Sequence, residues 1–446
     1  MKAKLLSLII AIALTLTSLG SLSACGAGVG SGGSGTGDPS DGSSTGNNPP
    51  ISGGDSAGTG EGNDVGTSDD TDKAPEFYPG FGDEDIKIDD IAASTRALLS
   101  VVSITSHFER YYGSGFGYDY DDSSTQSYVS YGTGVFIDVD RETGDAYVLT
   151  NYHVVYHYDS ITSNKISDDI EIFLYGQETK NYAIKATYVG GSMTEEVALL
   201  KIEGSEIIKN SYAIPITAGN SDECSVLDTV VAIGNSEGEG IQATAGHISV
   251  DNQELSITAA DQRTTITLNV MRFSAAINEG NSGGGLFDST GRMVGLVVAK
   301  KLGSDVDNLA YAIPINRAMA IAGAIKDTCN GTTNTQLYRY MLGFTMNSDV
   351  RGLEIDPETG KIDKVSLVKV DTVISGGLLE GKIAKGDIIR YVTVDGVKRE
   401  ITQVYQVVEH MFNAREGSVV TIGVTRGNID VSFTETMTEE CKTLIK

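Results

Sequence analysis

Residues able to carry out nucleophilic chemistry occur at two distant places in this chain of 446 residues. Ser282 lies in residues 280–286, GNSGGGL, and His153 lies in residues 150–155, TNYHVV, directly after a strand-like run. A serine flanked by glycines can expose its hydroxyl, and two backbone N–H groups of such a loop can converge on an oxyanion. A histidine brought beside that hydroxyl can take its proton. The two runs therefore predict nucleophilic acyl chemistry, with proteolysis as the favoured reaction.

The acid that would orient His153 is marked more weakly than the serine and the histidine. Glu196 precedes an apolar run at residues 197–202, so we expect it where a loop enters a buried strand. A carboxylate at that place could accept the imidazole N–H and fix its tautomer. A surface glutamate beside Glu195 is the alternative role for Glu196, and Asp168 and Asp169 are alternative acids.

Chain order discriminates between two folds. Residues 280–284 also match the G-x-S-x-G pattern of α/β-hydrolases, in which the histidine follows the serine, whereas a chymotrypsin-like fold has histidine, acid and then serine. Only His410 follows Ser282, and it lies in a predicted second domain. The order favours the chymotrypsin-like fold and leaves an α/β-hydrolase esterase as the competitor. The rivals of His153 that precede Ser282 are His157, which is nearest, and His107 and His247, which lie in loop-like or hairpin-like contexts.

The elements that must position these residues are mostly strands. Short β-branched runs separated by Gly, Asn and Asp predict an all-β sandwich or barrel rather than a parallel α/β sheet. A short helix is expected at residues 91–99. The segment from His107 to Tyr131 is expected to be an inserted loop, either decoration or a contact with a neighbouring subunit. Strands are expected at residues 101–104, 134–137, 146–149, 170–174, 183–189, 197–202 and 229–233.

Composition excludes several functions. With 33 Lys and Arg against 60 Asp and Glu, the net charge is −27, which argues against nucleic-acid binding and against polybasic attachment to an anionic membrane. Hydrophobic residues make up 40% of the chain, enough for packed cores, and the length suggests two or three folded units. Cys224, Cys329 and Cys441 form neither a disulfide framework nor a metal-binding spacing.

The first residues predict export. Lys2 and Lys4 precede an apolar run, and residues 22–25, LSAC, resemble a bacterial lipobox in which Cys25 becomes the lipidated first residue. We expect a lipoprotein signal peptide at residues 1–24, with an uncleaved membrane anchor as the alternative. Residues 25–85, rich in Gly, Ser and Asp, predict a disordered tether. This arrangement places the folded part outside the cytoplasm, lipid-anchored to the bacterial cell membrane.

Six blocks of the sequence resemble the HtrA (Deg) family of serine proteases, in which a chymotrypsin-like domain precedes a PDZ domain. The family's histidine and serine fall on His153 and Ser282. The family normally has aspartate where this chain has Glu196 and proline where it has Gly285, and Glu279 also departs from the pattern. A catalytically impaired, chaperone-like protein is therefore the alternative. The blocks are 132–138 (GTGVFID), 149–155 (LTNYHVV), 196–202 (EVALLKI), 232–235 (AIGN), 275–284 (AAINEGNSGG) and 311–315 (YAIPI).

The resemblance implies a mainly β structure, with a trypsin-like double-barrel protease domain at residues 86–330 and a PDZ domain at residues 335–446. It implies that the backbone N–H groups of Gly280 and Ser282 hold the oxyanion, and that neither a metal nor an organic cofactor is needed. A small, apolar specificity pocket predicts cleavage after small or medium aliphatic residues. Its expected lining is Ala275, Ala276, Ile277, Val297 and Val298.

The second domain is expected to begin near Leu337 and to contain one helix at residues 403–413. Its residues Leu342, Gly343 and Phe344 resemble the carboxylate-binding loop of PDZ domains, in which backbone N–H groups hold an anion and a peptide adds a strand. A small β domain without a peptide groove is the alternative. The implied partners are unfolded or misfolded exported proteins and peptide C-termini, and the implied assembly is a homotrimer.

Overall fold

The computed structural model describes residues 93–111, 125–298, 310–329, 337–355, 357–358, 360 and 362–445. The predicted signal peptide, Cys25 and the predicted tether lie outside these residues. None of the described helices is both long and apolar enough to cross a bilayer. The described chain begins with a short helix, α2 (Ala93–Arg96), followed by a 3₁₀ turn, η2 (Ala97–Ser100), close to the helix expected at residues 91–99.

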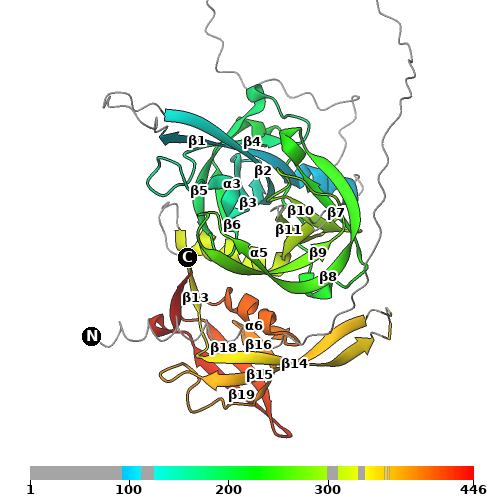
Figure 1. Cartoon of the computed structure of the whole chain (residues 1–446), viewed down its shortest axis with the longest axis vertical. Coiled ribbons are helices and arrows are strands. Elements are labelled where there is room, and N and C mark those ends of the chain that lie inside the picture. Colours follow the sequence, from blue (N-terminus) through cyan, green and yellow to red (C-terminus); the bar gives the residue numbers. More distant parts are fainter. Residues whose placement is uncertain are drawn as a thin grey trace, which may run out of the picture. The chain divides into compact units, whose positions relative to one another are not determined.

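The first six strands close into a barrel in the order β1-β2-β3-β6-β5-β4 (Figure 1). Alternate residues of each strand point inward, because side chains alternate across a strand. Fully buried side chains such as Ile104, Phe136 and Leu200 fill this barrel. The strands are β1 (Val101–Tyr111), β2 (Thr125–Asp140), β3 (Asp145–Thr150), β4 (Asp169–Leu174), β5 (Ile184–Ser192) and β6 (Val197–Ile202), and the short helices are α3 (Tyr152–Val155), η3 (Lys180–Tyr182) and α4 (Glu206–Lys209).

The β1–β2 hairpin corrects the prediction of an inserted loop from His107 to Tyr131. His107 pairs with Val129, and the register continues until Tyr111 lies opposite Thr125. Aromatic side chains support the outer part of this hairpin: the rings of Phe108 and Tyr128 lie with their centroids 6.2 Å apart. Such cross-strand aromatic pairs stabilise antiparallel strands. Both flanks of the expected loop are therefore strands, and residues 112–124 lie outside the described residues.

The next six strands close into a second barrel in the order β10-β11-β12-β9-β8-β7. The two closed antiparallel barrels confirm the predicted mainly β, double-barrel fold and exclude the α/β-hydrolase alternative. Only the first of these strands is among those predicted. They are β7 (Thr229–Gly234), β8 (Gln242–Thr258), β9 (Thr265–Phe273), β10 (Gly285–Asp288), β11 (Met293–Val298) and β12 (Ala310–Pro314), and the 3₁₀ turns are η4 (Ser221–Glu223) and η5 (Ser236–Gly238).

A helix that the sequence did not predict, α5 (Ile315–Cys329), follows β12 without a loop. Its buried side chains share one core cluster with Leu149 and Val197 of the first barrel and with Leu296 and Val298 of the second. This shared apolar layer joins the two barrels, so that the ends of β3, β6 and β11 meet on a common core.

The C-terminal part contains a six-stranded sheet in the order β14-β15-β16-β18-β19, with β17 paired to β16. The helix expected at residues 403–413 is present as α6 (Val404–Met411), which begins at a capping box formed by Gln403 and Gln406. The predicted domain boundary falls outside the described residues. The strands are β13 (Leu337–Tyr340), β14 (Phe344–Ile355), β15 (Ile362–Val373), β16 (Ile388–Val394), β17 (Val397–Glu400), β18 (Val419–Arg426), β19 (Ile429–Thr436) and β20 (Lys442–Ile445), which pairs with β13, and η6 (Glu439–Cys441) precedes β20.

Candidate active site

His153 lies in α3, directly after β3, and its ring contacts the carboxylate of Glu196. The distance from His153 Nδ1 to Glu196 Oε2 is 2.9 Å. The Glu196 side chain is fully buried, whereas 24% of the His153 side chain is exposed. A carboxylate that accepts the Nδ1–H keeps the proton on that nitrogen and leaves the Nε2 lone pair to act as a base. This pair has the geometry expected of the histidine and acid of a catalytic triad.

Glu196 occupies a backbone conformation that glycine usually adopts, with φ +54°. This left-handed region costs a residue with a Cβ about 1–2 kcal/mol. Two contacts with the α3 segment hold the residue: Asn151 Nδ2 donates to Glu196 O at 2.9 Å, and the His153 backbone N–H donates to Glu196 Oε2 at 3.4 Å. Asn151 is fully buried, and its role was not recognised from the sequence.

The loop that carries Ser282 has a shape that two glycines make possible. Gly280 has φ +95° and Gly283 has φ +84°. A Cβ built on Gly280 would lie 2.1 Å from Asn235 O, and one on Gly283 would lie 2.2 Å from Thr150 Oγ1. Any larger residue would therefore both strain the backbone and collide with a neighbour. Because Thr150 ends β3, three residues before His153, the loop is packed against the strand end that carries the histidine.

Hydrogen bonds fix the orientation of the peptide groups before Ser282. The Glu237 backbone N–H donates to Glu279 O at 2.7 Å. In a planar trans peptide the N–H points opposite to the C=O. The Gly280 N–H is therefore directed away from Glu237. Ser282 itself is 4% exposed.

Thr133, a fully buried residue of β2, ties this loop to the first barrel. Its hydroxyl donates to Gly280 O at 2.6 Å and accepts from the Asn235 N–H at 2.8 Å. Its backbone N–H donates to Ser282 O at 2.8 Å, and its carbonyl accepts from Thr150 Oγ1 at 2.7 Å. Thr133 lies in the block 132–138 that resembles the HtrA family. The role of Thr133 could not be predicted from the sequence, because it depends on contacts between the barrels.

The rival candidates have other surroundings. Burial lowers the pKa of His157, whose ring packs at a tilt against Tyr128, and Asp168 and Asp169 are exposed. Glu196 is thus the candidate acid that the structure brings to His153. The remaining alternative residues have partners other than His153, Glu196 and Ser282. These are Asp169 with Lys185 at 2.5 Å, His107 with Glu171 at 3.3 Å, His247 Nδ1 with Leu227 O at 3.2 Å, and His410 Nε2, which donates to Val397 O at 2.9 Å.

The expected lining of the specificity pocket divides between two core clusters. Ala275, Ile277 and Val297 pack together inside the second barrel. Val298 lies in the cluster that contains α5, because neighbouring residues of β11 point to opposite faces. Ala276 is exposed, and its carbonyl accepts from Thr244 Oγ1 at 2.7 Å. Val297 rather than Val298 therefore remains the candidate pocket residue from β11.

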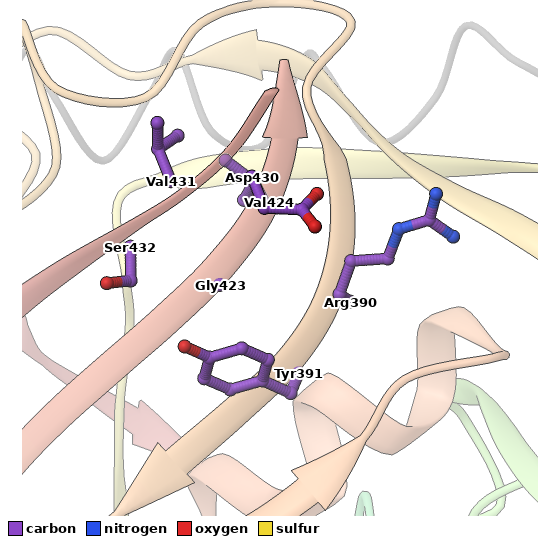
Figure 2. A pocket seen from close by; sticks show the side chains of 7 residues that line it. All are labelled: Arg390, Tyr391, Gly423, Val424, Asp430, Val431 and Ser432. Carbon is purple, nitrogen blue, oxygen red and sulfur yellow. The ribbon is translucent and has the colours of Figure 1, made fainter. Parts of the chain in front are cut away.

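A separate cavity of about 300 Å³ lies in the C-terminal sheet, among β16, β18 and β19. Figure 2 shows the Tyr391 ring beside Gly423, where a built Cβ would lie 2.1 Å from the ring. None of the candidate catalytic residues lines this cavity. Its lining is Arg390, Tyr391, Gly423, Val424, Asp430, Val431 and Ser432. Elsewhere in the described chain, no three His, Cys, Asp or Glu side chains are grouped as metal ligands would be.

Comparisons with known proteins find similarity to serine proteases. Residues 132–296 match the family model of the trypsin-like peptidase domain. The serine protease Do-like HtrA of Bacillus subtilis (strain 168) is 31% identical over 224 residues, which cover 50% of this chain and 45% of that protein. The serine protease Do-like HtrA of Lactobacillus helveticus is 26% identical over 358 residues, covering 76% of this chain and 78% of that protein.

Two further similarities are to a periplasmic protein and to a solved structure. The periplasmic pH-dependent serine endoprotease DegQ of Escherichia coli (strain K12) is 28% identical over 280 residues, covering 61% of this chain and 52% of that protein. A structure of the HtrA-type protease AlgW with a decapeptide is 23% identical and covers 79% of this chain and 98% of that chain, with a TM-score of 0.46. The chain thus spans about half the length of the Bacillus and Escherichia relatives.

Proposed function

We propose that this chain is a serine endopeptidase of the HtrA type that degrades unfolded or misfolded exported proteins outside the cytoplasm. The observation that carries this proposal is the 2.9 Å contact between His153 Nδ1 and the buried Glu196 carboxylate, beside the glycine loop of Ser282. The periplasmic relative and the predicted export signal support the extracytoplasmic location.

The proposed reaction passes through an acyl-enzyme. His153 Nε2 takes the proton of the Ser282 hydroxyl, whose oxygen attacks the peptide carbonyl. The N–H groups of Gly280 and Ser282 hold the oxyanion, and Glu196 stabilises the imidazolium. His153 then protonates the leaving amine, and water attacks the ester carbonyl to release the acid. Every proton in this sequence moves between the protein, the peptide and water.

We propose a preference for small or medium aliphatic residues before the cleaved bond. Ala275, Ile277 and Val297 supply small apolar side chains, and none of them carries a charge that would recognise a basic residue. We also propose that lipidated Cys25 anchors the protein, that residues 25–85 act as a tether, and that the protein assembles as a homotrimer. The LSAC run and the polar composition of the tether support the first two proposals.

A fluorophosphonate probe tests the proposed activity directly. We expect one covalent adduct on Ser282, located by mass spectrometry, and loss of digestion of a permanently unfolded protein in proportion to labelling. Digestion that continues at full rate after complete labelling would contradict the assignment. A folded protein that is neither labelled nor active would favour the catalytically impaired, chaperone-like alternative. Rapid turnover of a short-chain ester without peptide cleavage would also contradict an endopeptidase.

We propose further that the C-terminal sheet captures peptide C-termini. β14 lies at an edge of the sheet, where a peptide can add a strand. Leu342 and Phe344 are each 6% exposed, and between them Gly343 has φ +84°. The Gly343 carbonyl accepts from the Ile374 N–H at 2.9 Å, which fixes the loop that precedes β14. These features support a carboxylate-binding loop.

Binding should depend on the free carboxylate of the peptide. We expect a fluorescent peptide with an apolar C-terminal residue to bind at least about tenfold more tightly than its amidated form, since a charge-assisted contact to backbone N–H groups contributes about 1.5–3 kcal/mol. Gly343→Ala should weaken binding, because a built Cβ lies 2.6 Å from Gly377 Cα. Gly386→Ala is the matched control, with φ +89° and open space around it. Equal anisotropy titrations for acid and amide would contradict this site.

A further inference from the structure

Glu195, the residue before the triad acid, makes a buried ion pair that the proposed mechanism does not use. Arg317, in the first turn of α5, donates to Glu195 Oε2 from Nε at 2.9 Å and from Nη2 at 2.5 Å. The two side chains are only 5% and 9% exposed. They lie 122 positions apart in sequence, so the pair fixes the turn before β6 to a helix that follows the second barrel.

Stability alone is a weak explanation for this pair. Removing two charges from water costs several kcal/mol per ion, and apolar residues of similar volume often stabilise a core as well or better. Buried ion pairs are best attested where they fix one arrangement of the chain among several. The place of Glu195 next to Glu196 indicates which arrangement is fixed.

The strained torsion of Glu196 is held from both sides. The φ torsion turns the peptide group that joins Glu195 to Glu196 relative to the carbonyl of Glu196. Arg317 fixes the Glu195 side, and Asn151 holds the Glu196 carbonyl at 2.9 Å. The Glu195 N–H also donates to Ser192 Oγ at 3.2 Å. A residue in a sparsely populated conformation persists only where its surroundings determine it.

We propose that Arg317 is a positioning residue for the triad acid. By clamping Glu195 it keeps Glu196 at positive φ, with its carboxylate on His153 Nδ1. The inference rests on the proposed reaction of Ser282, His153 and Glu196. It differs from charge neutralisation, in which Arg317 would serve only to pair the buried carboxylate of Glu195.

Two variants separate these roles. Arg317→Met leaves Glu195 without its partner, whereas the double variant Arg317→Met with Glu195→Gln removes both charges and keeps similar side-chain volumes. Positioning predicts that the double variant unfolds near the wild-type temperature but has a kcat lower by up to about 10²-fold, the effect of a displacement of about 1 Å. KM should change little, because neither residue lines the candidate specificity pocket.

The His153 Nδ1–H proton provides a readout that does not depend on turnover. In the wild type we expect a strongly downfield proton resonance from the hydrogen bond to Glu196, identified by its loss in His153→Ala. The double variant should weaken or shift this resonance. If the double variant keeps both the resonance and the wild-type kcat, Arg317 only neutralises Glu195 and the inference is wrong. If the wild type shows the resonance but no peptide cleavage, the proposed function fails while the positioning role is still measured.

Discussion

Replacement of His153 by alanine should lower kcat/KM for an unfolded protein substrate by about 10⁴–10⁶-fold, the range measured when one member of a serine protease triad is removed. The expected loss is this large because Ser282 would have no base, and because no other described histidine is in place to substitute. The nearest rival, His157, packs against Tyr128 instead, with ring centroids 4.6 Å apart. Progress curves at several substrate concentrations would give kcat and KM separately.

His157→Ala is the matched control for this experiment. It removes an imidazole four positions away and should change kcat/KM by no more than a few fold, although the lost ring contacts should lower stability slightly. A second check is the pair His153→Ala with Ser282→Ala, which should be no less active than either single variant, because triad members act as a unit. Comparable losses from His157→Ala and His153→Ala would show that the base is assigned wrongly.

Replacement of Gly280 by alanine should reduce kcat by at least about 10²–10³-fold, the loss typical when one oxyanion donor is removed. The added methyl group would lie 2.1 Å from Asn235 O, and the residue would have to keep φ +95°. Relief of this collision requires the peptide before Gly280 to turn, which takes its N–H out of the oxyanion site. Single-turnover acylation measured with an activated ester would isolate this step from product release.

Gly204→Ala provides the control for backbone strain. Gly204 also has a positive φ, +60°, but no atom lies within 4 Å of its built Cβ. This variant should lose stability and keep its acylation rate. A Gly280→Ala enzyme with the acylation rate of the wild type would mean that the Gly280 N–H is not an oxyanion donor.

The candidate serine and histidine could be chosen from the sequence because the chemistry expected of them depends on local features. The glycines around Ser282 and the strand end before His153 mark these residues within a few positions. The acid could not be chosen in the same way, since Glu196, Asp168 and Asp169 all lie at or just before the start of a strand. Only the closed barrel separates them, by burying Glu196 and leaving both aspartates at the surface. Thr133 and Arg317 contact partners more than a hundred positions away, which no local pattern encodes.

There are also physical reasons why the sequence did not predict most strands of the second barrel or the helix that follows it. β8 is 17 residues long, but its inward alternation is weak: Ile248 and Ile257 are its buried hydrophobic residues, and most other positions are exposed or half-buried. In α5, by contrast, most positions are buried. It is buried on nearly every side, so its small apolar residues lack the polar stripe that identifies a surface helix. Hydrophobic periodicity identifies an element only when one of its faces is exposed to solvent and the other is buried.

The four hydrogen bonds of Thr133 have a consequence for the life of the protein before it is fully folded. The loop that would bind the oxyanion is held by a residue of the other barrel, so neither barrel alone can present a competent serine. A nascent or partly unfolded copy is a potential substrate of folded copies of the same protein. Such a copy is expected to have no proteolytic activity of its own. Premature autolysis is therefore expected to be limited, because the capacity to cut would appear only when the two barrels have docked.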